Sequence, residues 1–195
     1  MQILGNLNNY KILLASASPR RQELLHMLGL HFDVMHSKNV DESYPDDLPV
    51  DDVASYISQK KADAYLPLIN DNQLLITADT VVINDGFVLG KPADNDEAID
   101  MLHALADHTH KVITGVTIAT RQRQITFDAV TEVTFGPLSD EEIESYVMNF
   151  SPLDKAGAYG IQEWIGCIAV RNINGSYYNV MGLPIHRLYT ELKRF

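Results

Sequence analysis

The sequence contains only one cysteine, Cys167, among 195 residues. A single cysteine excludes an intramolecular disulfide and a zinc site built on several thiolates. The sequence also lacks the long apolar run and the cleavage site of a signal peptide, and no stretch approaches the length of a transmembrane helix. We therefore expect a cytoplasmic protein that has no membrane partner.

Positive charge is scarce in this chain. It has 15 Lys and Arg against 26 Asp and Glu, which gives a formal net charge of -11. Proteins that bind nucleic acid usually carry a basic face or stripe, so we expect no nucleic-acid partner. The first 22 residues nevertheless contain no Asp or Glu. This local excess of positive charge is suited to a small anionic ligand.

The length and the hydrophobic content of 46% are sufficient for a sizeable core. We expect residues 1–195 to form a single domain or two closely joined lobes, with residues 1–10 as a short extension of no evident role. Apolar spacing predicts a strand at Lys11–Ala15, a helix at Pro19–Leu28 and a strand at His31–Met35. This order is typical of an α/β protein.

Further helices and strands alternate along the rest of the chain. Asn84-Asp-Gly86 is a hairpin turn signal, and Ser139 with Glu142 forms a capping box that starts a helix. The fold class predicted is a mixed α/β sheet surrounded by helices. The helices are expected at about 50–65, 96–106 and 139–148 and after Pro184, and the strands at 74–83, 87–89, 111–120, 124–134 and 167–173.

The segment Ser16-Ala-Ser-Pro-Arg-Arg21 lies between the first strand and the first helix. A helix amino terminus offers unpaired N–H groups and a positive dipole end, which suits an anion. The alternative is that Ser18 simply caps the helix with Pro19 at its first position, and that both arginines are solvated. Taken alone, the segment does not decide between the two.

Two groups of carboxylates are candidates for chemistry. Asp79 follows the apolar run Leu74-Leu-Ile76, and a carboxylate at such a strand end can hold a divalent metal or accept a proton from water. Residues 41–52 hold six acids and no base, and we expect most of these acids to be solvated. Glu42 is an exception only if folding brings it beside Asp79.

Three other segments attract weaker interpretations. Gly86-Phe-Val-Leu-Gly-Lys91 differs from a P-loop in its glycine spacing and in Pro92, although Lys91 remains a candidate phosphate contact. The segment 153–162 combines glycines with Lys155, a mobile positive charge, but it also fits an ordinary surface loop. His108 and His110 are expected to be structural or exposed.

Together, these segments resemble successive motifs of the Maf nucleoside triphosphate pyrophosphatases. They occur in the order of that family and cover nearly the whole chain from Lys11. The matching segments are Ser16-Ala-Ser-Pro-Arg-Arg21, Ala78-Asp-Thr-Val-Val82, Gly90-Lys-Pro92, His110-Lys-Val-Ile-Thr-Gly115, Asp154-Lys-Ala-Gly-Ala-Tyr-Gly160 and Gly175-Ser-Tyr-Tyr-Asn-Val-Met-Gly-Leu-Pro184.

The resemblance implies a fold of the Maf and inosine-triphosphatase type, a mixed twisted sheet in two lobes with a central cleft, and commonly a homodimer. It implies hydrolysis of a nucleoside triphosphate to the monophosphate and pyrophosphate with Mg²⁺ or Mn²⁺ as cofactor. Asp79 matches the general base of the family. Positions associated with metal or phosphate binding are Ser16, Arg21, Glu42, Lys61, Asp79, Lys91 and Lys155.

Three further positions bear on the substrate. Arg20, Thr80 and Gln162 are similar to the branch of the family that acts on dTTP and UTP, whereas the branch that acts on 7-methyl-GTP has Trp, Gln and Glu there. The resemblance thus favours pyrimidine nucleotides. One departure is the segment from Phe32 to Glu42, which is one residue longer than the family pattern.

Two other functions stay open at this point. The first is a house-cleaning pyrophosphatase for modified or non-standard nucleotides. The second is a nucleotide-binding regulator of cell division without useful turnover, which could dispense with Asp79. The presence of Asp79 together with the lysines favours an enzyme.

Overall fold

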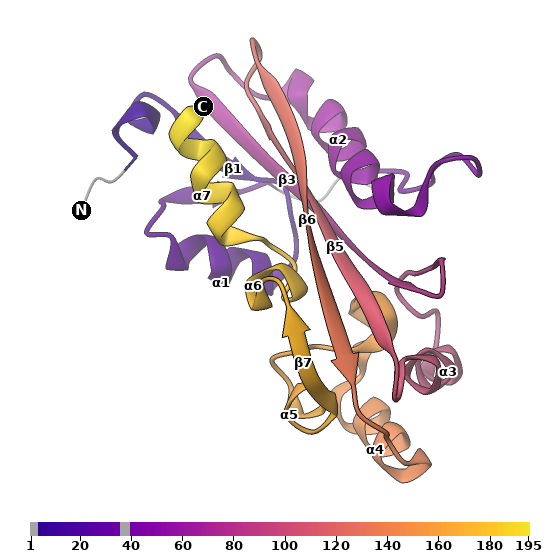
Figure 1. The fold of residues 1–195 in the computed structure, drawn as a ribbon. Helices are drawn as coiled ribbons and strands as arrows, with labels where there is room; N and C mark the ends of the chain where they lie inside the picture. Colours follow the sequence, from indigo (N-terminus) through magenta and orange to yellow (C-terminus); the bar gives the residue numbers. More distant parts are fainter. Residues whose placement is uncertain (1–3, 36–39) are drawn as a thin grey trace. The chain divides into compact units, whose positions relative to one another are not determined.

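The computed structural model describes residues 4–35 and 40–195, and these form two compact units. Unit 1 comprises the chain up to Asp79 with Thr114–Ala129 and Gly182–Phe195, and unit 2 comprises Thr80–Ile113 and Val130–Met181. Three long strands contribute residues to both units (Figure 1): β3 (Gln73–Asn84), β5 (Thr109–Ala119) and β6 (Gln124–Phe135). Whether the chain folds as one domain stays a prediction.

The sheet is mixed, as predicted. Its order is β2-β1-β3-β5-β6-β7, and β4 pairs with β3 outside this path. Strand β1 (Lys11–Leu14) pairs in parallel with β2 (Phe32–Val34) and with β3. Strands β4 (Phe87–Leu89) and β7 (Val170–Asn174) pair antiparallel with β3 and β6, respectively.

Unit 1 contains α1 (Pro19–Met27), α2 (Val53–Tyr65) and α7 (Ile185–Arg194), with 3-10 turns at Val50–Asp52 and Leu66–Leu68. Helix α2 packs on β3 and β5 through buried hydroxyls, because Ser58 Oγ donates to Thr117 Oγ1 at 3.0 Å and Thr77 Oγ1 donates to the Ser58 carbonyl at 2.8 Å. A side chain at Gly115 would lie 2.4 Å from the backbone of Ala54. This close approach fixes α2 against the sheet.

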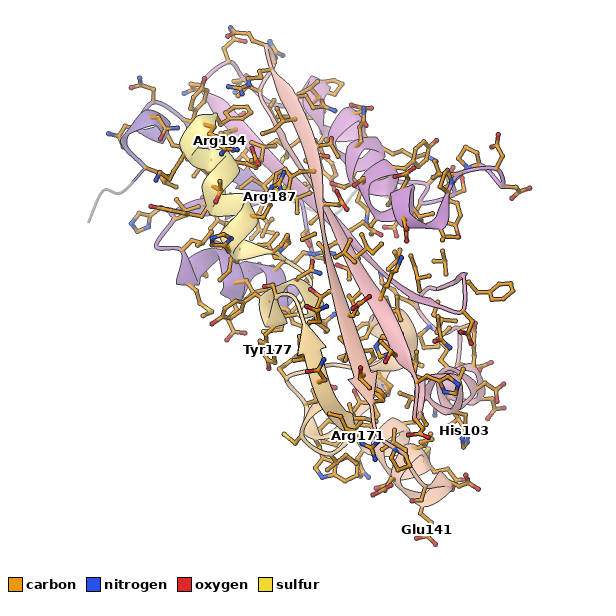
Figure 2. The ribbon with its side chains drawn as sticks, viewed as in Figure 1. His103, Glu141, Arg171, Tyr177, Arg187 and Arg194 are labelled. Carbon is orange, nitrogen blue, oxygen red and sulfur yellow. The ribbon has the colours of Figure 1, made fainter. Side chains whose placement is uncertain are left out.

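Residues 4–10 of the amino-terminal extension pack onto the last helix. They form a 3-10 turn at Gly5–Leu7 in which Leu7 is buried, and the Asn6 amide donates to the Leu192 carbonyl at 2.8 Å. Figure 2 labels Arg187 and Arg194 on α7, and both arginines pair with Glu191. The extension therefore covers apolar surface of unit 1, a role that the sequence analysis did not find.

Unit 2 contains α3 (Asn95–Leu105), α4 (Asp140–Phe150), α5 (Trp164–Ala169) and α6 (Tyr177–Val180) around a second core. The capping box of Ser139 and Glu142 is confirmed at the start of α4. The hairpin turn between β3 and β4 is also confirmed. Asp85 and Gly86 have φ values of 49° and 82°, and two positive φ values suit the twist of a two-residue hairpin.

The strand predicted at 167–173 is wrong in its first half. Residues Trp164–Ala169 form α5, and the strand occupies Val170–Asn174. Ile165 and Ala169, four residues apart, are both fully buried, which is a helical spacing. The sequence analysis also missed the short helix α6, where the Ser176 side chain accepts from the Asn179 amide.

No helix among the described residues is long and apolar enough to cross a membrane. Part of the long segment from Phe32 to Glu42 lies outside the described residues, so its extra residue is not located.

Candidate active site

The ammonium group of Lys61 lies between two carboxylates in unit 1. Its Nζ is 2.7 Å from Oδ1 of Asp79 and 2.8 Å from Oε1 of Glu42. The side chains of Lys61 and Asp79 are only 14% and 12% exposed, whereas that of Glu42 is 47% exposed. Folding thus brings Glu42 to the same ammonium group as Asp79, which was the condition set for assigning it a function.

The strand expected at 74–83 is confirmed as β3, and Asp79 lies inside it and not at the end of a strand that stops after Ile76, as its proposed role assumed. Within this continuous strand, Ala78 before Asp79 and Val81 two residues after it are buried and Thr80 is half-buried. Apolar runs on both sides continue the sheet because no turn residue interrupts them. A carboxylate buried in a strand needs a partner, and Lys61 supplies one.

Arg21 is anchored beside these carboxylates. Its Nε donates to the Gly182 carbonyl and its Nη1 to the Ala78 carbonyl, each at 2.8 Å. Burial lowers the pKa of Arg21, and the charges of Asp79 and Glu42 oppose that decrease. The alternative in which Arg21 is solvated is therefore wrong.

The start of α1 has features of both interpretations of this segment, the helix cap and the anion site. Ser18 is the N-cap residue and Pro19 follows at the first helical position, yet the Ser18 side chain makes no capping hydrogen bond within the described chain. Its backbone N–H instead donates to Ser16 Oγ at 3.3 Å. Arg20, the neighbour of Arg21, is half-buried. The turn thus presents Ser16 and both arginines from the end of β1.

Lys60, which the sequence analysis did not select, holds the loop that carries Glu42. Its Nζ is 3.0 Å from Asp41 Oδ2 and donates to the Ser43 carbonyl at 2.8 Å. Hydrogen bonds from Ser43 are the main cause of a lowered pKa of Asp41, and the contact with Lys60 adds to it. We expected most acids of this loop to be solvated without a partner. Asp41 differs from that expectation, because it is bonded to Ser43 and Lys60.

Lys155 lies in unit 2 and is not the mobile surface charge that we expected. Its residue is only 7% exposed, and its Nζ lies 2.7 Å from Asp154 Oδ1 and 3.2 Å from Glu163 Oε1. The Tyr146 hydroxyl donates to Glu163 and accepts from the Gly160 amide at 3.0 Å. This network orients the Lys155 side chain, and the sequence offers no spacing signal for it.

The loop of Lys155 also contacts the segment that precedes Lys91. The Gly157 amide donates to the Gly90 carbonyl at 3.0 Å. Gly157 has a φ of 67°, and a Cβ there would lie 2.9 Å from Cγ2 of Val82. Only glycine fits this close approach without strain. Lys91 itself is exposed. The hydrogen bond between Gly157 and Gly90 places the segments of two predicted phosphate ligands, Lys155 and Lys91, side by side in unit 2.

The remaining predicted residues, Thr80 and Gln162, both belong to unit 2. Thr80 is half-buried in β3 and belongs to unit 2, next to Asp79 in the chain. Because successive side chains of a strand point to opposite faces, Thr80 and Asp79 do not share a face of the sheet. Gln162 is exposed in unit 2, before α5.

The carboxylates of unit 1 fit a divalent metal. Oxygens of Asp79 and Glu42 converge within 2.8 Å of one ammonium nitrogen, so both can reach a single cation. Mg²⁺ is commonly bound by one or two carboxylates, with water and substrate phosphate as its other ligands. The described residues contain no group of three or more acids, histidines and cysteines placed to hold a metal.

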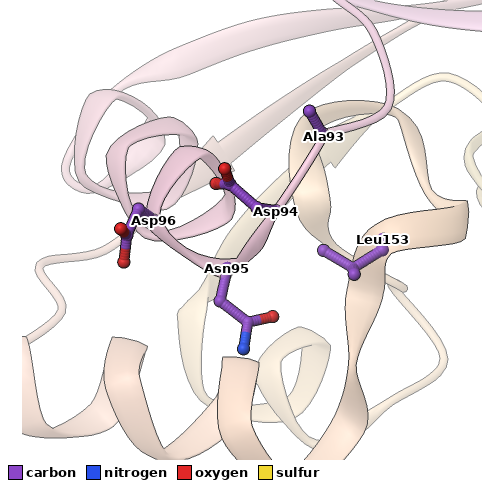
Figure 3. Close-up of a pocket in the computed structure, with 5 residues that line it drawn as sticks. All are labelled: Ala93, Asp94, Asn95, Asp96 and Leu153. Carbon is purple, nitrogen blue, oxygen red and sulfur yellow. The ribbon is translucent and has the colours of Figure 1, made fainter.

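A separate pocket lies at the start of α3 (Figure 3). It is lined by Ala93, Asp94, Asn95, Asp96 and Leu153. Asp94 accepts from the Glu97 amide at 2.9 Å and so serves as the helix cap. Acidic residues in the first turn make this helix start unsuitable for a phosphate. None of the predicted site residues lines this pocket.

The two histidines have the roles that were expected. His108 is exposed, whereas His110 is 2% exposed and its Nε2 lies 2.8 Å from the Tyr159 hydroxyl. The rings of His110, Phe135 and Tyr159 pack edge to face. Burial lowers the pKa of His110 to about 4, so it is neutral at pH 7 and structural.

The fold and the paired charges define an α/β protein with a candidate anion-binding centre. A solved structure, the Ham1 protein of Staphylococcus aureus, has a similar fold with a TM-score of 0.52 at 13% identity, covering 93% of this chain and 99% of that one. At this identity the likeness concerns the fold alone, and it confirms the predicted class of a mixed sheet flanked by helices.

The chain belongs to the Maf family, because residues 11–195 match the family described as "Maf-like protein". It is 55% identical to a protein of Phocaeicola vulgatus, over 98% of this chain and 100% of that protein. It is 53% identical to a protein of Parabacteroides distasonis, over 99% of this chain and 100% of that protein. Both relatives are named dTTP/UTP pyrophosphatase. The resemblance found in the motifs is thereby confirmed.

Proposed function

We propose that this chain is a nucleoside triphosphate pyrophosphatase that hydrolyses dTTP and UTP to the monophosphate and pyrophosphate. The observation that carries the proposal is the cluster in unit 1, where Lys61 lies between Asp79 and Glu42 with Arg21 anchored nearby. The names of relatives that match over their whole length support the same reaction.

In the proposed reaction, a water molecule attacks the α-phosphorus of the nucleotide and pyrophosphate leaves. Asp79 accepts the proton of the attacking water as general base. The hydrogen bond from Lys61 Nζ to Asp79 Oδ1 orients this carboxylate and leaves Oδ2 for the water. The Asp79 carboxyl then releases the proton to solvent before the next turnover.

The cations neutralise the charge of the triphosphate. Arg21 is held by two backbone carbonyls, so its guanidinium is already oriented before the nucleotide binds. Lys61 adds a second positive charge in unit 1. We propose that Ser16, Lys91 and Lys155 also bind phosphate oxygens, as the resemblance implies. Reactions at phosphorus benefit chiefly from such charge neutralisation and positioning.

We propose Mg²⁺ or Mn²⁺ as the cofactor, held by Asp79 and Glu42. When bound, such an ion supplies positive charge to the phosphate oxygens and lowers the pKa of a coordinated water. The two carboxylates already converge on Lys61, and the phosphate groups of the substrate offer an alternative partner for this lysine.

We propose that Arg20, Thr80 and Gln162 select the base. The exposed amide of Gln162 can both donate and accept a hydrogen bond, which suits the edge of a pyrimidine. The proposal further includes a cytoplasmic homodimer that does not act on nucleic acid. These properties rest on the composition and on the resemblance to the family.

The test is a panel of canonical and modified triphosphates with Mg²⁺ or Mn²⁺, in which released pyrophosphate and single phosphate are measured separately. We expect pyrophosphate from dTTP and UTP and little product without metal. Release of single phosphates would overturn the proposed reaction. Faster hydrolysis of modified nucleotides would favour a house-cleaning role, and tight binding without turnover would favour a regulator.

A further inference from the structure

Two neighbouring lysines of α2 pair with two neighbouring acids of the loop before it. Lys60 pairs with Asp41 at 3.0 Å, and Lys61 pairs with Glu42 at 2.8 Å. All four residues belong to unit 1. The second of these pairs belongs to the proposed active site, whereas the first has no part in it so far.

The contacts of Lys60 bracket Glu42. Its Nζ lies 3.0 Å from Asp41 Oδ2, 2.8 Å from the Ser43 carbonyl and 3.3 Å from Ser43 Oγ. Asp41 and Ser43 are in turn bonded to each other, because Asp41 Oδ1 accepts from the Ser43 amide at 3.0 Å and Asp41 Oδ2 accepts from Ser43 Oγ at 2.7 Å. One ammonium group thus holds the residues on both sides of Glu42.

This arrangement bears on Glu42 because the acidic loop that carries it lies at the surface. Residues 41–47 are all exposed, and the Glu42 side chain is 47% exposed. A long side chain on an exposed loop loses rotamer and backbone freedom when it is held at one point. Fixing the backbone at positions 41 and 43 in advance reduces the freedom that is lost when Glu42 reaches Lys61.

We infer that Lys60, through Asp41 and Ser43, is a positioning residue that holds Glu42 against Lys61 and Asp79. This inference rests on the proposed function, since it assigns Lys60 a part in that reaction through Glu42. Lys60 contacts Asp41 and Ser43, the residues on either side of Glu42, and so acts on the loop that carries Glu42. An ordinary exposed ion pair contributes little, so the effect should depend on Glu42 and not on charge alone.

The main variant is Lys60→Met, which keeps the aliphatic stem and removes the ammonium group. Lys60→Arg is the conservative variant, since a guanidinium can still donate to Asp41 and to the Ser43 carbonyl. Lys11→Met is the matched control. It removes another exposed ion pair of unit 1, that of Lys11 with Asp33, far from the acidic loop in sequence.

The first measurement is hydrogen–deuterium exchange of the peptide that contains residues 41–43, without nucleotide. We expect faster exchange in Lys60→Met, because the Ser43 amide loses the fixed position of its acceptor Asp41. Lys60→Arg and Lys11→Met should exchange as the wild type does. Unchanged exchange in Lys60→Met would overturn the inference, whatever the enzyme's activity.

The second measurement is a double-mutant cycle on pyrophosphate release from dTTP with Lys60→Met, Glu42→Gln and both together. We expect Lys60→Met to lower kcat about three- to tenfold in the wild-type background, and to cause no further loss when Glu42 is already Gln. Lys60→Arg should restore most of the rate. An equal loss in both backgrounds would overturn the inference.

These outcomes separate the inference from the proposed function. A wild-type protein without activity on any triphosphate contradicts the proposed function, whereas the exchange experiment still decides whether Lys60 holds the loop. An active wild type with a Lys60→Met variant of full activity contradicts only the inference. Equal melting temperatures of Lys60→Met and Lys11→Met exclude a general loss of stability as the cause.

Discussion

Lys61 Nζ lies 2.7 Å from Oδ1 of Asp79, which joins helix α2 to strand β3 through a mostly covered ion pair. Asp79 is itself buried within a strand, so its charge requires this partner. The same ammonium group also holds Glu42. Two carboxylates therefore converge on one cation, and the proposed reaction at phosphorus depends on this arrangement of charge.

Asp79→Asn should preserve the fold and nucleotide binding while kcat for dTTP falls by about 10² or more, because an amide cannot accept the proton of water. Pyrophosphate release and nucleotide binding are measured on the same preparation. Asp33→Asn, on β2 in unit 1, is the control and should retain full activity. Near-normal turnover in Asp79→Asn would remove Asp79 as the base.

Gln162→Glu should lower kcat/KM for dTTP and UTP about tenfold relative to other triphosphates, because the amide donor to the base is lost. The comparison requires the full nucleotide panel. Gln122→Glu introduces the same charge at another exposed position, in the turn between β5 and β6, and should have no such effect. An equal loss for all nucleotides in Gln162→Glu contradicts a role in reading the base.

Gly157→Ala should destabilise the protein by about 2–4 kcal/mol, because its positive φ and the contact with Val82 both oppose a side chain. Gly86→Ala separates the two causes. Gly86 also has a positive φ, of 82°, but nothing lies within 4 Å of its added Cβ, so about 1 kcal/mol is expected. Urea unfolding measures both, and equal losses would show that the contact with Val82 is unimportant.

The stability of the protein should decrease in mild acid because of His110. Burial lowers the pKa of His110 to about 4 in the folded protein, from an ordinary 6.5. Below pH 6.5 the unfolded chain takes up a proton that the folded protein does not, so protonation favours unfolding. The contribution of neutral His110 to the free energy of unfolding is therefore complete above pH 6.5. It decreases by about 3 kcal/mol in all as the pH falls from 6.5 to 4.

His110→Gln provides the comparison for this pH dependence, since an amide can still bond to Tyr159 but does not titrate. The free energy of unfolding of the wild type minus that of His110→Gln should decrease by about 3 kcal/mol as the pH falls from 7 to 4. A pH-independent difference between the wild type and His110→Gln contradicts the assignment.

Local signals predicted most of the secondary structure. Helix α1 was expected at Pro19–Leu28 and is found at Pro19–Met27, since proline favours a helix start and Gly29 favours its end. The capping box of α4 and the Asp85-Gly86 turn are equally local. The strand expected from Cys167 failed because a short apolar run fits a buried helix as well as a strand.

The candidate site was predictable only where a motif carried it. Asp79 and Arg21 lie in two of the ordered motifs that resemble the Maf family, and Lys61 was selected through the same resemblance at a position outside these motifs. Their contacts were not predictable, because Lys61 and Asp79 are 18 residues apart and lie in different elements. Lys60 belongs to no motif, so its contacts with Asp41 and Ser43 appeared only in the structure.

The sequence by itself determined the family, the class of fold and the residue types available for the reaction. These follow from apolar periodicity, turn chemistry and motif order, all of which are local properties of the chain. Only the tertiary structure decided which charges meet. Helix α2 packs onto the sheet through its buried face, and this packing carries Lys60 to Asp41 and Lys61 to Glu42 and Asp79. Contacts of this kind depend on packing in three dimensions, which spacing along the chain does not specify.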